Sequence, residues 1–237
     1  MNSLAVIIPA LNEAATLSDV LSALGREVPE ASVIVVNDAS DDGTEEVVID
    51  AGGNVLTLAA QLGPWGATQA GIRRACELGF ENVVTMDADG QHLPESVTRL
   101  TSAMRKRGAD IVVGSAPGRG SKLRTLAWRM MRLVSGLEIT DLTSGFRLYN
   151  RKAMNLLADE RASYLQYQDI GVLALALEHE LQIVEVDVDM APRQQGVSRI
   201  FNSWLSVMVY MLNTLLLGLS KRSRYRTTLN ARHGDPR

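Results

Sequence analysis

The chain has 237 residues, of which 46% are hydrophobic and 22% charged, so it is long enough for one large domain, with or without an appendage, and it does not have the composition of a disordered protein. Its net charge of −3 gives no reason to expect a nucleic-acid partner. The single cysteine, Cys76, excludes an internal disulfide, and the first residues, Met1-Asn2-Ser3-Leu4, lack the basic and apolar regions of a secretory signal, so we expect a cytosolic protein.

The first half of the chain alternates short apolar runs with helix-like stretches. Continuous apolar strands separated by helices are typical of a parallel sheet that is covered on both faces, so we predict an α/β fold. Gly79 and Gly108 each follow a predicted helix, where glycine is a common stop signal. The predicted strands span residues 4–9, 33–37, 55–58, 83–86 and 111–113, and the predicted helices between them span residues 14–24, 44–51, 64–78 and 94–107.

Polar segments follow the first two predicted strands. The segment 9–13 is Pro-Ala-Leu-Asn-Glu, and its backbone and Glu13 have the chemistry to hold a nucleoside, although by itself the segment would be an ordinary loop. In the segment 37–44, Asp38 has the chemistry to accept hydrogen bonds from a base or ribose, whereas the residues after it fit a turn that caps the next helix. Ligands of parallel sheets bind beyond the carboxyl ends of the strands, so we expect these segments to lie together.

Two aspartates one residue apart follow the fourth predicted strand. Residues i and i+2 of a strand point to the same side, so Asp87 and Asp89 are expected to converge on one hard cation, with Gln91 as a further oxygen ligand. Such ligands suit Mg²⁺ or Mn²⁺, which usually shares its coordination with substrate phosphates. The alternative is a solvated turn that caps the helix beginning at Pro94.

The second half of the chain is less regular. We predict helices at residues 122–137 and 169–180, and strands at residues 145–150 and 183–190, the last from its alternating pattern. His92, His179 and His233 are too scattered to predict a zinc site.

Residues 200–220 contain no charged side chain, and a basic cluster follows them in residues 221–226. This length is borderline for crossing a bilayer. An apolar helix beside a basic cluster fits a peripheral position on anionic lipid, through residues 200–226, and we favour that interpretation over a core or dimer helix. A homo-oligomer that pairs through the helix around Trp204 is a further hypothesis.

Four motifs follow one another along the chain: Ile7-Ile8-Pro9-Ala10-Leu11-Asn12-Glu13, Val35-Val36-Asn37-Asp38-Ala39-Ser40-Asp41-Asp42-Gly43-Thr44, Asp87-Ala88-Asp89-Gly90-Gln91-His92 and Thr143-Ser144-Gly145-Phe146-Arg147. In these motifs and their order the chain resembles the family-two glycosyltransferases. Within that family, the chain most resembles the dolichyl- or polyprenyl-phosphate sugar synthases, over roughly residues 4–200.

This resemblance implies a GT-A fold: a Rossmann-like, mostly parallel sheet flanked by helices, here with a C-terminal apolar helix. The glycosyltransferase domain would span residues 1–200, with a nucleotide-binding half at about 1–115, an acceptor half at about 116–200, and an apolar helix and basic tail at 201–237. The resemblance also implies that the donor diphosphate is held through a metal. The expected metal ligands are Asp87, Asp89 and Gln91, and the expected nucleoside pocket comprises Pro9, Ala10, Asn12, Glu13 and Asp38.

Three later segments carry further candidates. Arg147 has a fixed fork of donors that suits phosphate, and the alternative is an ion pair with Asp141. Asp169 lies where many relatives have an acidic residue, so it is either a general base or a helix-capping carboxylate. The segment 193–199 resembles the family's late loop, in which Arg193, Ser198 and Arg199 would contact phosphates; the alternative is a basic surface loop.

Taken together, the motifs predict an inverting transfer of a hexose from a UDP- or GDP-linked donor to a lipid phosphate at the cytosolic face of the membrane. In that reaction Asp89 would act at the catalytic centre through the metal. The nearest alternative keeps the fold and transfers the sugar to a hydroxyl group, with Asp169 as the base. A nucleotidyltransferase would need a glycine-rich basic loop after the first strand, and the segment 9–13 is not one. A non-catalytic binding module is disfavoured by the intact Asp87, Asp89 and Gln91.

Overall fold

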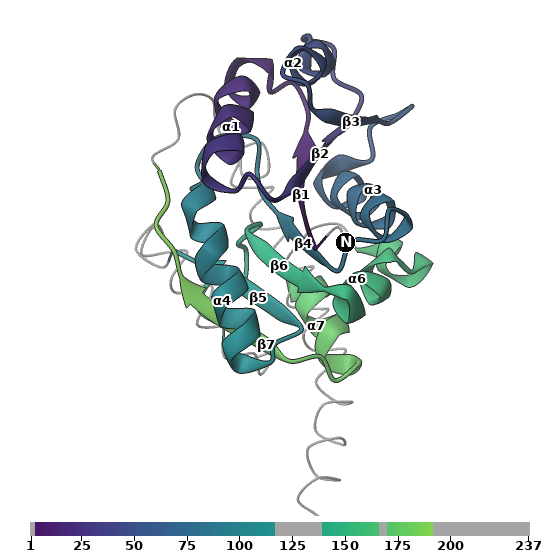
Figure 1. Cartoon of the computed structure of the whole chain (residues 1–237). Helices are drawn as coiled ribbons and strands as arrows, with labels where there is room; N and C mark the ends of the chain where they lie inside the picture. The colour runs from purple at the N-terminus through teal and green to yellow at the C-terminus, as the bar shows by residue number, and fades with distance from the viewer. Residues whose placement is uncertain (1–2, 117–138, 166–169, 192–237) are drawn as a thin grey trace, which may run out of the picture.

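The computed structural model describes residues 3–116, 139–165 and 170–191. Seven strands form one sheet in the order β3-β2-β1-β4-β6-β5-β7, and helices cover both of its faces (Figure 1). The predicted helices at residues 122–137 and 200–220 lie outside the described residues. Within the described ranges, no helix is both long and apolar enough to span a membrane.

The first half of the sheet follows the predicted alternation closely. Every predicted strand is present, and its bounds differ from the prediction by no more than two residues. The elements are β1 (Leu4–Ala10), α1 (Ala14–Glu27), β2 (Ser32–Asn37), α2 (Thr44–Asp50), β3 (Asn54–Thr57), α3 (Gly63–Glu77), β4 (Asn82–Thr85), η1 (Pro94–Ser96), α4 (Val97–Arg107) and β5 (Ile111–Ser115).

The second half departs further from the prediction. The strand predicted at 145–150 begins two residues later, and the strand predicted at 183–190 ends at Asp187. A short helix that the sequence did not predict follows β6, where the Asn150 side chain accepts from the Ala153 N–H at 3.0 Å and starts the helix. The elements are β6 (Arg147–Asn150), α6 (Arg151–Ala158), η3 (Glu160–Tyr164), α7 (Ile170–Glu178) and β7 (Ile183–Asp187).

One strand of the sheet runs against the others. The strand β6 pairs antiparallel with both β4 and β5, whereas every other pair is parallel. The sheet is therefore mostly parallel, as predicted, but the amino end of β6 lies at the same edge as the carboxyl ends of its neighbours. That reversal brings the segment before β6 to the edge where ligands of such sheets bind.

Two hydrophobic cores lie on the two faces of the sheet. The core under α3, α6 and α7 includes Trp65, Ile72 and Leu157, and the core under α1 and α4 includes Leu17 and Leu100. Because both faces are covered, the central strands are apolar on both sides, which is why they appear in the sequence as continuous runs.

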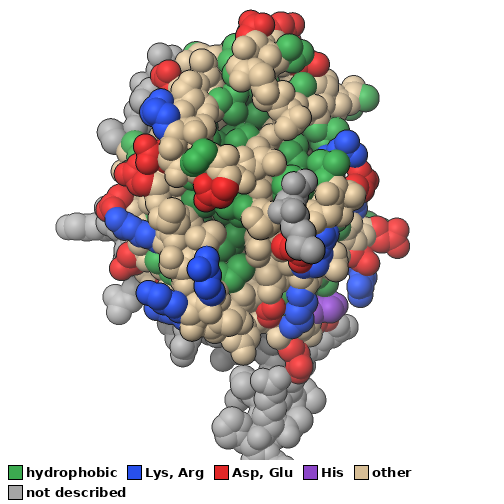
Figure 2. Space-filling model, in the orientation of Figure 1, with side chains coloured by type: hydrophobic (Ala, Val, Ile, Leu, Met, Phe, Trp, Pro, Cys, Tyr) green, Lys and Arg blue, Asp and Glu red, His purple; other side chains and the backbone are tan. Residues whose placement is uncertain are grey.

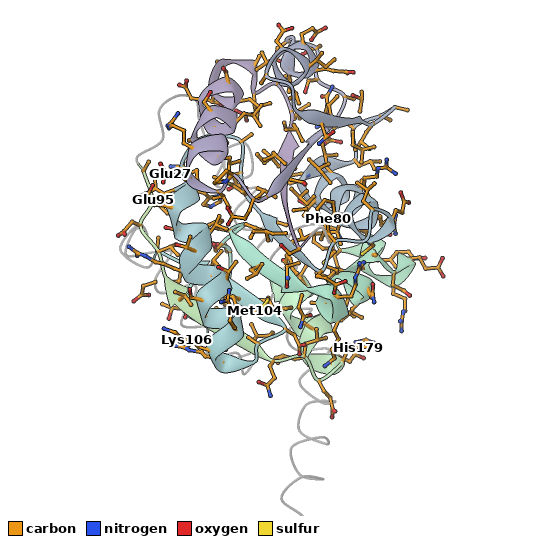
Figure 3. The ribbon with its side chains drawn as sticks, viewed as in Figure 1. Glu27, Phe80, Glu95, Met104, Lys106 and His179 are labelled. Carbon is orange, nitrogen blue, oxygen red and sulfur yellow. The ribbon has the colours of Figure 1, made fainter. Side chains whose placement is uncertain are left out.

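Charged side chains at one end of α2 and one end of α4 suit the helix dipole. The first turn of α2 carries Glu45 and Glu46, and the last turn of α4 carries Arg105, Lys106 and Arg107. Figure 2 shows acidic side chains over α2 at the top of the molecule and most basic side chains of this face lower down. In α4, Met104 packs toward the sheet while Lys106 points away from it (Figure 3).

Helix α3 packs closely on the sheet at Gly71. A Cβ atom at this position would overlap Ile7 Cγ2 and lie 2.9 Å from Val36 Cγ2. We expect Gly71→Ala to destabilise the protein by about 2 kcal/mol, because the sheet must shift to admit the methyl group. The measurement is denaturant unfolding followed by circular dichroism.

The matched control is Gly25→Ala in α1, where a Cβ atom would meet nothing within 4 Å. This substitution should leave stability unchanged or raise it by up to about 1 kcal/mol, because alanine is the better helix former. Equal stability of the two variants would contradict the close approach of α3 to β1.

Candidate active site

The candidate site lies at the edge where β1, β2, β4, β5 and β7 end and β6 begins. Because β2, β1 and β4 are neighbours in the sheet, the turns that follow them meet at this edge, as expected. The segment 139–146, which leads into β6, joins them there.

The turns after β1 and β2 are tied together by side chains. The Asn12 N–H donates to Ser40 Oγ at 3.0 Å, and Asn12 Oδ1 accepts from the Asp41 N–H at 2.9 Å. The Glu13 N–H donates to Thr44 Oγ1 at 3.0 Å. Asn12 itself has φ 52, a left-handed conformation that asparagine tolerates. The two turns therefore form one cross-linked unit.

Asp42 adds a charged group to this unit. Its carboxylate accepts hydrogen bonds from the N–H groups of Ala14 and Thr44, each at 3.1 Å, and from the Thr44 hydroxyl. Burial raises the pKa of the Asp42 carboxyl, but the hydrogen bonds from the Thr44 side chain and from these N–H groups outweigh it, so the pKa lies below its ordinary value. The predicted role of Asp42, shaping the turn and starting α2, matches these contacts.

Asp38 is buried, and both of its carboxylate oxygens face the start of α3. Oδ1 accepts from the Leu62 N–H at 2.6 Å and Oδ2 from the Gly63 N–H at 2.9 Å. The residue after it, Ala39, has φ 59, which is uncommon for a residue with a Cβ atom. Asp38 thus anchors the turn after β3, a role that the sequence did not indicate, and its contact with a nucleoside stays a prediction.

The acidic pair follows β4, but the alternation of a strand does not extend to it. The strand β4 ends at Thr85, so Asp87 and Asp89 belong to the following turn and do not share one side of a strand. The Asp87 side chain is 53% exposed, and Asp89 Oδ1 accepts from the Gln91 N–H at 3.1 Å. The three proposed ligands therefore come from one turn, although by a different geometry from the one predicted.

His92 closes this turn, and sequence reasoning missed its role. Its Nδ1 atom accepts from the Asp87 N–H at 2.9 Å, so the ring proton is on Nε2, which lies 3.7 Å from Asp87 Oδ2. The buried ring stacks on Phe146, with the ring centroids 5.0 Å apart. The only signal in the sequence was the position of a histidine five residues after Asp87.

The segment before β6 lies directly against Asp87. The Thr85 hydroxyl donates to the Gly145 carbonyl at 2.8 Å, and a Cβ atom at Gly145 would lie 2.9 Å from Asp87 Oδ1. Because Gly145 has no side chain, the Asp87 carboxylate can occupy the space beside it.

Arg147 is fully buried, and two of its donors are used by backbone carbonyls. Its Nε atom donates to the Ser144 carbonyl at 2.8 Å, and Nη2 donates to the Leu142 carbonyl at 2.9 Å. The Asp141 carboxylate, its suggested ion-pair partner, accepts instead from the N–H and hydroxyl of Thr143. These contacts show that Arg147 holds the backbone of this segment, and its contact with phosphate stays a prediction.

The remaining candidates, Asp169, Arg193, Ser198 and Arg199, lie outside the described residues. In the parts of the chain that the structure describes, no three Asp, Glu, His or Cys side chains gather as a metal site. Two carboxylates and an amide, all oxygen donors, nevertheless fit a hard cation that completes its coordination with ligand phosphates.

Comparisons with known proteins found a matching family model and similar chains. The family model described as Glycosyl transferase family 2 matches residues 5–158. The undecaprenyl-phosphate mannosyltransferase of Micrococcus luteus is 34% identical over 91% of this chain and 94% of its own length. The polyprenol monophosphomannose synthase of Mycolicibacterium smegmatis is 31% identical over 84% of this chain and 81% of its own.

A solved structure shares the fold. Glucosyl-3-phosphoglycerate synthase from Mycobacterium tuberculosis, in complex with Mn²⁺, uridine-diphosphate-glucose and phosphoglyceric acid, has a TM-score of 0.69 and 21% sequence identity over 92% of this chain and 80% of its own.

The contact between Gly145 and Asp87 generates a prediction for metal binding. In Gly145→Ala the new methyl group displaces the Asp87 carboxylate, so we expect the affinity for Mn²⁺ to fall about tenfold. Stability should change little, because the displaced side chain is 53% exposed. An EPR titration with Mn²⁺ measures the affinity, and a thermal melt checks the fold. A folded variant with wild-type Mn²⁺ affinity would show that the position of this carboxylate does not matter for the metal.

Proposed function

This chain belongs to glycosyl transferase family 2, and on that premise we propose that it transfers a hexose from a nucleoside-diphosphate sugar to the phosphate of a polyprenyl lipid. The observation that supports a polyprenyl-phosphate acceptor is the 34% identity with an undecaprenyl-phosphate mannosyltransferase. The alignment extends over nearly the whole of both chains. The relative named as a polyprenol monophosphomannose synthase supports the same class of acceptor.

The donor is assigned to the turns after β1, β2 and β4. In this proposal the nucleoside of the donor is lined by the buried Asp38 and by the segment at the end of β1, that is, by Pro9, Ala10, Asn12 and Glu13. Asp87, Asp89 and Gln91 hold a Mg²⁺ or Mn²⁺ ion beside the diphosphate, which agrees with the Mn²⁺ and UDP-glucose in the solved complex of similar fold. When bound, the ion offsets the negative charge that develops on the leaving diphosphate.

The residues of the chain bind and orient the reactants in the proposed reaction. An oxygen of the acceptor phosphate attacks the anomeric carbon as the bond to the nucleoside diphosphate breaks, and the configuration inverts. Because that phosphate is ionised at neutral pH, the attack needs no general base. Arg193, Ser198 and Arg199 are assigned to phosphate contacts, and the chemistry depends mainly on positioning and electrostatics.

The proposed place of action is the cytosolic face of the membrane. A polyprenyl phosphate has its phosphate at the bilayer surface, and residues 200–226 combine an apolar run with a basic cluster that suits anionic lipid. In this proposal the enzyme is peripheral.

The donor site is tested by calorimetric titration of UDP and GDP, each with and without Mn²⁺. We expect one nucleotide to bind in a metal-dependent manner, and we expect Asp89→Ala to weaken that binding at least tenfold, because it removes a metal ligand. Asp19→Ala, which removes an exposed carboxylate on α1, is the control and should bind like the wild type. If neither nucleotide shows metal-dependent binding to the wild type, the proposed mechanism fails.

The acceptor is tested with Asp169→Asn. A lipid-phosphate enzyme should keep most of its activity, because its acceptor is already ionised, whereas an enzyme that uses a hydroxyl acceptor should lose nearly all activity without its base. The assay measures sugar transfer to polyprenyl phosphate in detergent, with hydrolysis of the donor measured separately. A loss of transfer with intact donor binding would favour a hydroxyl acceptor.

A further inference from the structure

The segment 140–146 is buried along most of its length, yet side chains rather than a β-ladder satisfy many of its backbone groups. Thr85 donates to the Gly145 carbonyl, and the Ser144 hydroxyl both accepts from the Phe146 N–H at 3.2 Å and donates to the Gly114 carbonyl at 2.6 Å. Unpaired backbone groups would be costly at such a depth, so the side chains that pair with them decide the path of the segment.

Glu185 of β7 holds the beginning of this segment. Its two carboxylate oxygens accept from the Thr140 N–H at 2.9 and 2.8 Å, and Oε1 also accepts from the Asp141 N–H at 2.8 Å. Hydrogen bonds from backbone N–H groups to a carboxylate are charge-assisted and stronger than neutral ones. A single side chain therefore fixes two consecutive peptide groups.

Arg147, which carries the opposite charge to Glu185, binds the middle of the same segment. Glu185 and Arg147 flank Val113 in one cross-strand row, because each is the register partner of Val113. The Glu185 carboxylate accepts from the N–H groups of Thr140 and Asp141. The Arg147 guanidinium donates to the carbonyls of Leu142 and Ser144, which follow them in the chain. The segment is thus held across the sheet by two charges on neighbouring strands.

The far end of the segment reaches the proposed metal site. Gly145 follows directly after the Ser144 carbonyl that Arg147 holds, and the space above Gly145 is occupied by the Asp87 carboxylate. A shift of the segment toward β4 would push on Asp87, and a shift away would leave it without support. The contacts therefore connect Glu185 to a proposed metal ligand through the backbone of residues 140–145.

We propose that Glu185 is a positioning residue for the donor site, which sets the Asp87 carboxylate by fixing the segment 140–145. This inference rests on the proposed function, because Asp87 is taken to hold the metal of the donor complex. Glu185 touches no reacting group itself, and its effect is transmitted by the hydrogen bonds to Thr140 and Asp141.

The experiment compares Glu185→Ala and Glu185→Gln with the wild type. Glutamine keeps one oxygen that can accept from both N–H groups, so it should lose less than alanine. For Glu185→Ala we expect about tenfold weaker Mn²⁺ affinity by EPR titration and faster amide exchange at Thr140 and Asp141 by NMR. Exchange in β1 should be unchanged. Glu81→Ala, which removes an exposed carboxylate beside the amino end of β4, is the control and should bind Mn²⁺ like the wild type.

The outcomes separate this inference from the proposed function. If the wild type shows no metal-dependent nucleotide binding, the proposed function fails and Glu185 has no donor site to position. If the wild type binds but a folded Glu185→Ala variant has wild-type Mn²⁺ affinity, the positioning role is overturned. Equal losses in the alanine and glutamine variants would overturn the hydrogen-bond basis of the role.

Discussion

Backbone groups that leave a β-ladder inside a folded protein still need hydrogen-bond partners, and this requirement governs the carboxyl edge of the sheet. Here the partners are side chains from β6, β7 and the turn after β2. Glu185 and Arg147 supply them for the segment before β6, and Asp38 supplies them for the start of α3. The turns that would surround a donor are therefore fixed before any ligand arrives, which lowers the entropy that binding must overcome.

Charged residues at this edge divide into two groups by what they touch. Asp38, Glu185 and Arg147 face the backbone and build the walls of the site. Asp87 is exposed to solvent, and its amide and carboxylate are both near His92. Residue type alone does not separate the two groups. The sequence does not distinguish a carboxylate that accepts backbone N–H groups from one that is proposed to bind a cation.

The strands and most helices could be predicted because their signals are local. Apolar runs mark buried parallel strands, and helix caps such as Gly108 mark ends. The direction of β6 depends on long-range pairing, which no local pattern reports. The same limit applies to the site: the turns could be placed at one edge from topology, but the stacking of His92 on Phe146 joins residues far apart in the chain. The burial of Arg147 was likewise invisible, because an arginine in a strand is usually assigned to the surface.

The reversed strand also places two strand ends side by side. Because β5 ends at Ser115 and the antiparallel β6 begins at Arg147 on the same edge, the chain that joins them begins and ends at neighbouring points of the sheet. Lengthening a connection whose ends are already close costs little, about 0.6 kcal/mol for each doubling of its length. A change in the length of this connection therefore leaves the order of the strands unchanged.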